Sequence, residues 1–226
     1  MWTLSGTYNL RRAAHQDWLY RSATLDQLES VDFDTLRAND VGLVVDLREE
    51  RERPSHAASI TTIHIPIYDL PDGPPQLGSI TSIYELMLFD RGHKLAVAVS
   101  TIAQADAPVL VHCTAGKDRT GLVVALTLLA SGVDESAIID DYAASGHHVR
   151  PRRHALVAES LASLDLSGNE LSDAFELHLD SPATALESAL AEVRVRFGSI
   201  TNYLLAHGVT TDEITMLVDR RMAHHA

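Results

Sequence analysis

The sequence predicts an α/β fold, in which helices flank a central, mainly parallel sheet and a helical elaboration follows toward the C-terminus. Strand and helix patterns alternate over the first 130 residues, and helical periodicity dominates beyond Asp134. Two short apolar runs, 42–47 and 108–112, lack the alternation of a half-exposed strand. Such continuous runs are typical of strands buried on both faces of a parallel sheet.

The other elements of the sheet half follow from shorter patterns. The segment 69–75 contains three prolines, one glycine and two aspartates, so it is predicted to be a loop. Apolar spacing assigns the remaining elements. They are strands at 19–22 and 60–67, a short helix at 33–39, and two helices within 79–104 that break near Gly92.

A helix that begins around Thr120 is apolar on every side and is predicted to lie buried at the centre of the domain. Gly132 is expected to cap its C-terminus. The helices expected after it cover roughly 134–144, 152–164, 170–178, 183–205 and 211–222. We expect one domain over 1–226, with a sheet core at about 1–145 and a helical elaboration at about 146–226.

The charge of the chain restricts its partners. The formal net charge is −13, so most of the surface repels nucleic acid and anionic membranes, and no nucleic-acid partner is expected. An anionic substrate must therefore bind at a local positive site. The longest strongly apolar run, 121–130, is about half the roughly 20 residues that span a bilayer, so stable membrane insertion is not expected.

The chain has one cysteine, so no disulfide can form within it, which fits a reducing compartment. The first residues lack the basic and apolar segments of a Sec signal peptide. A cytoplasmic location is therefore expected, although secretion by another route stays open, as does the oligomeric state.

The candidate reactive residues lie in a short loop that connects a predicted buried strand to the apolar helix. Backbone N–H groups in a tight loop and at a helix N-terminus bind oxyanions, and a cysteine placed among them ionises readily. Cys113 is thus predicted as a nucleophile, and Arg119, six residues later, as a bidentate phosphate ligand. The predicted phosphate-binding residues are Thr114, Ala115, Gly116, Lys117, Asp118, Arg119 and Thr120.

The spacing Cys-x5-Arg followed by Thr resembles the signature of the protein tyrosine phosphatase superfamily. The string His-Cys-Thr-Ala-Gly-Lys-Asp-Arg-Thr-Gly, residues 112–121, is similar to the loop of bacterial tyrosine/serine phosphatases related to a mycobacterial B-type enzyme. Further matching segments are 20–23, 45–48, 141–145, 203–204 and 208–210. The resemblance implies a tyrosine phosphatase-like fold and hydrolysis of phosphotyrosine through a cysteinyl-phosphate, with no cofactor.

One segment departs from the family. Members usually carry Asn-Phe-Arg-Asp and then glycine near the N-terminus, whereas here Asn9-Leu10-Arg11 is followed by Arg12 and two alanines. The acidic partner is missing, so the contribution of this segment to the loop stays open.

Two aspartates are candidates for the general acid that protonates the leaving group. Asp69 is favoured, because it lies on a loop after a strand and the resemblance places an aspartate there. Asp118, inside the phosphate loop, is the alternative.

Three further residues are expected to support the loop. Asp46 and Arg48 end a strand at the carboxyl edge of the sheet, where ligands bind in open α/β folds. Arg48 is expected to brace the loop, and His112 to orient it through hydrogen bonds. Most of the remaining charged run 48–53 is expected to be a solvated surface.

Lys117 is one of only two lysines and lies in the loop, which suggests a substrate with more than one phosphate. The expected partner is a phosphorylated protein, with phosphoserine/threonine sites or a phosphoinositide as additional substrates. The segment 152–205 is interpreted either as a lid over the thiolate or as a stabilising layer. Arg150, Arg152 and Arg153 are expected to rim a pocket.

Other classes of protein fit the motif less well. Gly116-Lys117 is followed by aspartate, so the loop is not a nucleotide-binding P-loop, and no second cysteine is available for an arsenate-reductase relay. The histidine pairs 147–148 and 224–225 lack the i, i+4 spacing of helical ligands, so no metal is expected. The alternative function is a catalytically silent phosphate-ester binding module.

Overall fold

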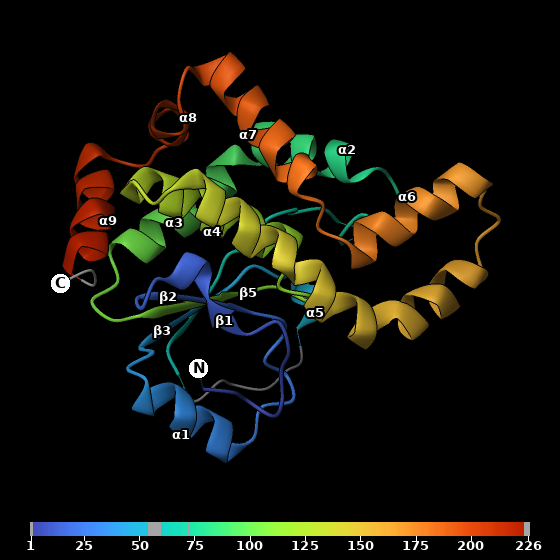
Figure 1. The fold of residues 1–226 in the computed structure, drawn as a ribbon, viewed down its shortest axis with the longest axis horizontal. Coiled ribbons are helices and arrows are strands. Elements are labelled where there is room, and N and C mark those ends of the chain that lie inside the picture. The colour runs from blue at the N-terminus through green and yellow to red at the C-terminus, as the bar shows by residue number, and fades with distance from the viewer. Residues whose placement is uncertain (1, 54–59, 72, 224–226) are drawn as a thin grey trace.

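A five-stranded sheet lies at the centre of the computed structural model, which describes residues 2–53, 60–71 and 73–223 (Figure 1). Within these residues the strand order is β1 (Arg11–Arg12), β2 (Leu19–Ser22), β5 (Val109–His112), β3 (Leu43–Asp46) and β4 (Thr62–His64). Strand β1 is antiparallel to β2, and the other pairs are parallel. The predicted mainly parallel sheet is confirmed.

Helices cover both faces of the sheet. Those described are α1 (Ser30–Ala38), α2 (Ile80–Glu85), α3 (Gly92–Ala103), α4 (Asp118–Ser131), α5 (Glu135–Ala162), α6 (Gly168–Leu179), α7 (Ala183–Phe197), α8 (Ile200–Ala206) and α9 (Thr211–Ala223). Helix α1 lies on one face, and α3, α4 and α9 lie on the other (Figure 1). A large hydrophobic core fills the second face, and a smaller cluster beside α1 fills the first. Strands β3 and β5 contribute to both clusters, which is why they are continuously apolar.

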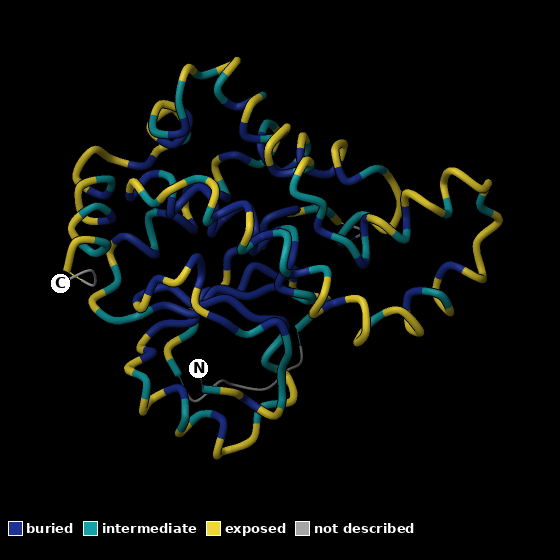
Figure 2. Tube along the Cα trace, in the orientation of Figure 1, coloured by how far each residue is buried: buried dark blue, intermediate teal, exposed yellow. Residues whose placement is uncertain are grey.

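Helix α4 is buried along almost its whole length, as its apolar pattern predicts (Figure 2). It packs against α3, α5, α8 and α9. Gly132 caps its C-terminus with a left-handed φ of 83°, as predicted. The N-terminus of α4 is thereby held at the carboxyl edge of β5.

The carboxyl ends of three parallel strands are level with one another. Ser22 of β2 and Asp46 of β3 both pair with His112 of β5. The residues that follow these strands therefore meet at one edge of the sheet, where a functional site is expected in this architecture.

Two predicted helix boundaries are wrong. A break is expected between 144 and 152, yet α5 is continuous through Pro151. The Ser181 hydroxyl forms hydrogen bonds with the backbone of α5 before Pro151. It accepts from the N–H of Gly146 (2.7 Å) and donates to the carbonyl of Ala143 (3.0 Å). The helix expected at 183–205 instead divides into α7 and α8, because Gly198 has a left-handed φ of 82°.

Two shorter elements also differ from expectation. Helix α1 begins at Ser30 rather than residue 33, because Glu29 at the N-cap and Asp32 in the first turn form a capping box. The strand expected at 60–67 is confined to β4.

The C-terminal half of α5 and helix α6 project from the body of the molecule (Figure 1) and enclose a small hydrophobic cluster of their own. The predicted division near residue 145 falls inside α5, so one helix joins the sheet region to this projection. The domain assignment itself stays a prediction. Within the described part of the chain, no helix has the length and apolar character needed to span a bilayer.

Candidate active site

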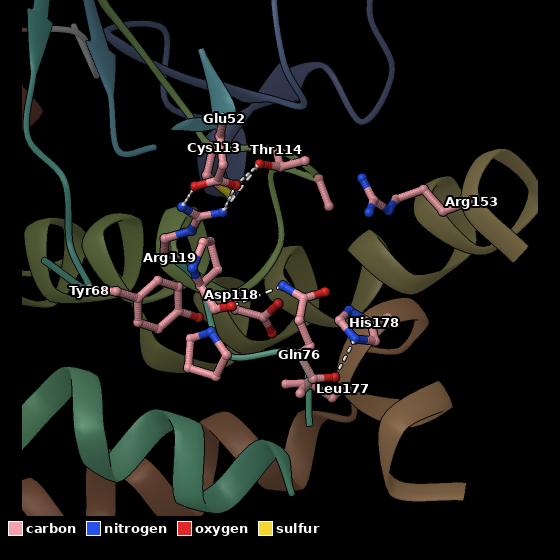
Figure 3. A pocket seen from close by; sticks show the side chains of 13 residues that line it. Glu52, Tyr68, Gln76, Cys113, Thr114, Asp118, Arg119, Arg153, Leu177 and His178 are labelled. Carbon is pink, nitrogen blue, oxygen red and sulfur yellow. Dashed lines mark hydrogen bonds and ion pairs between the residues drawn. The ribbon is translucent and has the colours of Figure 1, made fainter. Parts of the chain in front are cut away.

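The phosphate loop, residues 113–119, connects β5 to α4. Cys113 is 3% exposed and lines a cavity of about 170 Å³ (Figure 3). Gly116 has a φ of 67°, and a Cβ atom there would lie 2.1 Å from the carbonyl oxygen of Ser22. Glycine is required at this position, because the loop passes directly against the end of β2.

Side chains of the N-terminal segment hold the carbonyl groups of the loop. The Asn9 side chain donates to the carbonyl oxygens of Ala115 (3.1 Å) and Gly116 (2.9 Å). Arg21 also donates to the carbonyl of Gly116 (2.8 Å). In a trans peptide the N–H points opposite the C=O, so these bonds turn the amides of Gly116 and Lys117 to the other side of the loop. Amides gathered on one side form a nest for an oxyanion.

Arg11 and Arg21 form a buried cluster with Asp141 of α5. The Arg11 Nε atom and the Arg21 Nη1 atom each lie 2.7 Å from an Asp141 carboxylate oxygen. Burial raises the pKa of the Asp141 carboxyl, but the two guanidinium groups more than offset burial and hold it below its usual value. The acidic partner missing after Arg11 is therefore supplied by α5. Because the cluster contains two cations and one anion, it adds positive charge behind the loop.

Arg119 makes a two-pronged ion pair with Glu52. Its Nη1 and Nη2 atoms lie 2.6 and 2.8 Å from Oε2 and Oε1 of Glu52, and Oε1 also accepts a hydrogen bond from the Thr114 hydroxyl (Figure 3). The Arg119 Cζ atom lies 5.2 Å from the centroid of the Tyr68 ring. Burial raises the pKa of Glu52, but Arg119 and Thr114 bring it below its ordinary value. An ionised Glu52 thus fixes the orientation of the guanidinium.

The expectation of a mainly solvated charged run at 48–53 holds for Glu50 and Arg51, which are exposed, but is wrong for Glu49 and Glu52. Arg48 and Glu49 are buried, and Glu49 accepts hydrogen bonds from the backbone N–H groups of Tyr68 (3.0 Å) and Asp69 (3.2 Å). Glu52 itself lines the cavity. No sequence signal separates Glu52 from the other five charged residues of the run, because its role depends on a contact with a residue 67 positions away.

Arg48 is connected to the phosphate loop through Asp46 and Glu52. Its Nε and Nη2 atoms each lie 2.9 Å from an oxygen of Asp46, and its Nη1 donates to the carbonyl of Glu52 (3.2 Å). Asp46 lies 3.8 Å from Nε2 of His112. Burial lowers the pKa of His112 to about 4, although Asp46 opposes the change. The neutral ring then donates from Nδ1 to the carbonyl oxygen of Cys113 (3.3 Å).

The two aspartates considered as general acid lie in different places. Asp118 lines the cavity, and its Oδ1 accepts hydrogen bonds from the Lys117 ammonium (2.6 Å) and the Tyr84 hydroxyl (3.0 Å). The Asp69 carboxylate is 58% exposed and lies outside the cavity lining. It pairs with Lys94 at 3.0 Å, which lowers its pKa.

The backbone conformation explains why the Asp69 side chain points away from the cavity. Glu49 holds the amides of residues 68 and 69, and Asp69 adopts a left-handed φ of 49°. This conformation directs Tyr68, rather than its neighbour, into the cavity. Of the two candidates, Asp118 is the one that faces the cavity, and the choice of general acid between them stays a prediction.

Lys117 does not contribute its side chain to the cavity. Its ammonium group is buried and donates to the carbonyl oxygen of Asp180 (2.6 Å) as well as to Asp118. Lys117 therefore ties the phosphate loop to the connection between α6 and α7. The Lys117 ammonium therefore does not supply the additional positive charge that was expected at the substrate site.

The projecting helices form a wall of the cavity. Arg153 of α5 and Leu177 and His178 of α6 line it, across the cavity from Tyr68 (Figure 3). Gln76 lies beside His178, whose Nε2 is 2.8 Å from the Gln76 carbonyl oxygen. Pro74 and Pro75 also contribute to the lining. Of the three arginines expected at a rim, Arg153 alone lines this cavity; Arg150 pairs with Asp180, and Arg152 is exposed. Movement of this wall as a lid stays a prediction.

Among the described residues, no cluster of three or more His, Cys, Asp or Glu side chains is suited to hold a metal ion. The histidine pair 224–225 lies outside the described residues.

Comparison with known proteins gives consistent matches. A sequence model of the tyrosine phosphatase family matches residues 5–223. A tyrosine-protein phosphatase from Nostoc commune is 31% identical over 216 residues, covering 89% of this chain and 73% of that protein. The triple specificity protein phosphatase PtpB of Mycobacterium tuberculosis is 29% identical over 262 residues, covering 92% and 94%. The crystal structure of P. aeruginosa TpbA aligns with a TM-score of 0.45 and 18% identity, covering 88% and 91%.

Proposed function

The chain belongs to the tyrosine phosphatase family and is a cysteine-dependent phosphatase; from this premise we propose that it hydrolyses phosphotyrosine through a phosphoenzyme formed on Cys113. The observation that carries the proposal is that Cys113, Arg119 and Asp118 line one cavity. A nucleophile, a group for the phosphoryl oxygens and a proton carrier are what a two-step ester hydrolysis needs.

In the first step the Cys113 thiolate attacks phosphorus. The S–P bond forms while the P–O bond to the tyrosine oxygen breaks, and that oxygen takes a proton from Asp118. The Lys117 ammonium and the Tyr84 hydroxyl both donate to Oδ1 of Asp118, which leaves Oδ2 as the oxygen available to carry the transferred proton. Arg119 and the loop amides hold the phosphoryl oxygens as their charge shifts.

In the second step water attacks the cysteinyl-phosphate, and Asp118 takes the proton from that water. The S–P bond breaks, which releases inorganic phosphate and restores the thiolate. The Thr120 hydroxyl is buried and has no hydrogen-bond partner among the described residues, so it is available to the departing sulfur.

The shape of the cavity supports phosphotyrosine as the main substrate. Tyr68, Pro74 and Pro75 supply flat apolar surfaces for an aromatic ring. The Mycobacterium tuberculosis relative is named a triple specificity phosphatase, which supports phosphoserine/threonine sites or phosphoinositides as additional substrates. A silent binding module is not favoured, because every group that the chemistry requires is present.

The proposal is tested by assaying the chain on phosphotyrosine peptides and on p-nitrophenyl phosphate. We expect release of inorganic phosphate from both, and phosphate bound covalently to Cys113 after rapid acid quenching of the reaction. Folded protein that releases no phosphate from either substrate would rule out the proposed function.

The assignment of the general acid is tested with leaving groups of different basicity. Asp118→Asn should lower kcat/KM on phenyl phosphate roughly a hundredfold and affect kcat/KM on p-nitrophenyl phosphate much less, because kcat/KM reports the first step and nitrophenolate leaves without a proton. The matched Asp69→Asn variant should stay within about twofold of the parent on both substrates, since its carboxylate lies outside the cavity. The reverse pattern would return the role to Asp69.

A further inference from the structure

A cationic stretch of α5 borders the catalytic cavity. Residues 147–154 contain three arginines, three histidines and no acidic residue, in a chain whose net charge is −13. Within this stretch Arg153 is the residue that lines the cavity. Figure 3 shows its guanidinium directed toward the cavity from the side opposite Tyr68.

Arg153 has no carboxylate partner among the described residues. It interacts with the Tyr8 hydroxyl, which is uncharged at neutral pH, and burial raises the pKa of this hydroxyl further. The other cation of the cavity, Arg119, is already paired with Glu52. A guanidinium carries five N–H donors, so Arg153 keeps donors and an uncompensated charge for an incoming anion.

A second cavity adjoins the first at Arg153. It has a volume of about 70 Å³ and shares Gln76, Arg153 and His178 with the catalytic cavity. Its other walls include the apolar side chains of Leu156, Val157 and Leu161. Burial lowers the pKa of His178, so this ring is neutral at neutral pH and Arg153 supplies the fixed charge.

This combination fits an acidic amino-acid side chain. The methylene groups of a glutamate would contact the apolar walls, and its carboxylate would pair with the guanidinium in bidentate geometry. A single cation suits a singly charged carboxylate better than a second phosphate dianion, because the Lys117 ammonium is occupied by Asp118 and the Asp180 carbonyl.

We propose that Arg153 determines specificity by binding an acidic side chain next to the phosphorylated tyrosine, so that acidic phosphotyrosine peptides are the preferred substrate class. The proposal rests on the proposed function and extends the same site by a second anion-binding position.

The test compares matched peptides that carry glutamate or glutamine beside the phosphotyrosine. The parent should hydrolyse the glutamate peptide with a kcat/KM roughly threefold to tenfold higher at low salt, and the ratio should fall as salt screens the ion pair. Arg153→Gln should reduce the ratio to about one. Arg153→Lys should retain part of the preference, since lysine keeps the positive charge but cannot form the bidentate pair of a guanidinium. The readout is the ratio of the two peptides and not the absolute rate, because Arg153 lines the catalytic cavity and its loss also changes hydrolysis of p-nitrophenyl phosphate.

Arg152→Gln is the matched control, because Arg152 is exposed one residue away and does not line the cavity. It should leave the glutamate preference unchanged. Equal rates on the two peptides in the parent, or a preference that survives Arg153→Gln, would overturn the proposal. It is also overturned if Arg153→Gln impairs hydrolysis of a soluble inositol bisphosphate but not of the glutamate peptide.

Failure of the proposed function is a separate result. It would show as no hydrolysis of any substrate by the parent. Affinities of the two peptides for Cys113→Ser, measured by fluorescence anisotropy, would still test Arg153. The glutamate peptide should bind more tightly, and the difference should disappear in the Cys113→Ser/Arg153→Gln double variant; equal affinities would reject the assignment.

Discussion

Replacing Cys113 with serine should lower kcat on p-nitrophenyl phosphate by at least about 10⁴-fold. A serine hydroxyl ionises far less readily than a thiol, and the loop amides and Arg119 do not supply a base to remove its proton. The cavity itself should persist, because Cys113 and serine differ by one atom and Gly116 still sets the course of the loop.

Binding separates loss of the nucleophile from loss of the site. Inorganic phosphate or vanadate should still raise the melting temperature of Cys113→Ser, since both ions occupy the same donors. Substantial turnover by a well-folded Cys113→Ser protein would show that another group is the nucleophile. A variant that neither binds phosphate nor melts cooperatively would call for Cys113→Ala with the same measurements.

Arg119→Lys should lower kcat roughly 10³-fold although it preserves the charge. The guanidinium is held by both oxygens of Glu52 and lies over the Tyr68 ring. A lysine ammonium is a single point charge, so it cannot bond to Glu52 and to two phosphoryl oxygens in one fixed plane. The loss should appear mainly in kcat, because the charge of the phosphoryl group shifts most in the transition state.

Two further variants test this explanation. Glu52→Gln keeps a bond to Arg119 but weakens its orientation, and a smaller loss of roughly tenfold to a hundredfold is expected. Arg196→Lys is the control, because Arg196 pairs with Glu192 on α7 at 2.7 Å and its loss should leave kcat unchanged. Similar kcat values for Arg119→Lys and the parent would remove Arg119 from the catalytic step.

The sequence was informative where function depends on residues that are close together in the chain. The strand, the Cys-x5-Arg loop and the buried helix α4 occupy 109–131, and local chemistry was enough to predict all three. The supporting pair Asp46 and Arg48 could be predicted for a related reason, because parallel strands end at a common edge.

The sequence did not predict the placement of side chains that could turn either way. Asp69 follows a strand on a suitable loop, yet Glu49 and a left-handed φ turn it toward Lys94 and leave Tyr68 in the cavity. Glu52 looked like part of a solvated run, although it holds Arg119. Lys117 was predicted to bind the substrate, but its ammonium donates to the carbonyl oxygen of Asp180 and does not line the cavity.

The sequence by itself therefore determined the kind of chemistry, because a nucleophilic cysteine, an arginine and a helix N-terminus lie within seven consecutive residues. Tertiary structure decided which other side chains share the cavity. Glu52, Asp118 and Arg153 come from three separate elements, and only folding brings the first and last of them beside the phosphate loop. Their roles depend on distances and ion pairs between elements that are far apart in the chain. The periodicity of the sequence contains no information about these contacts.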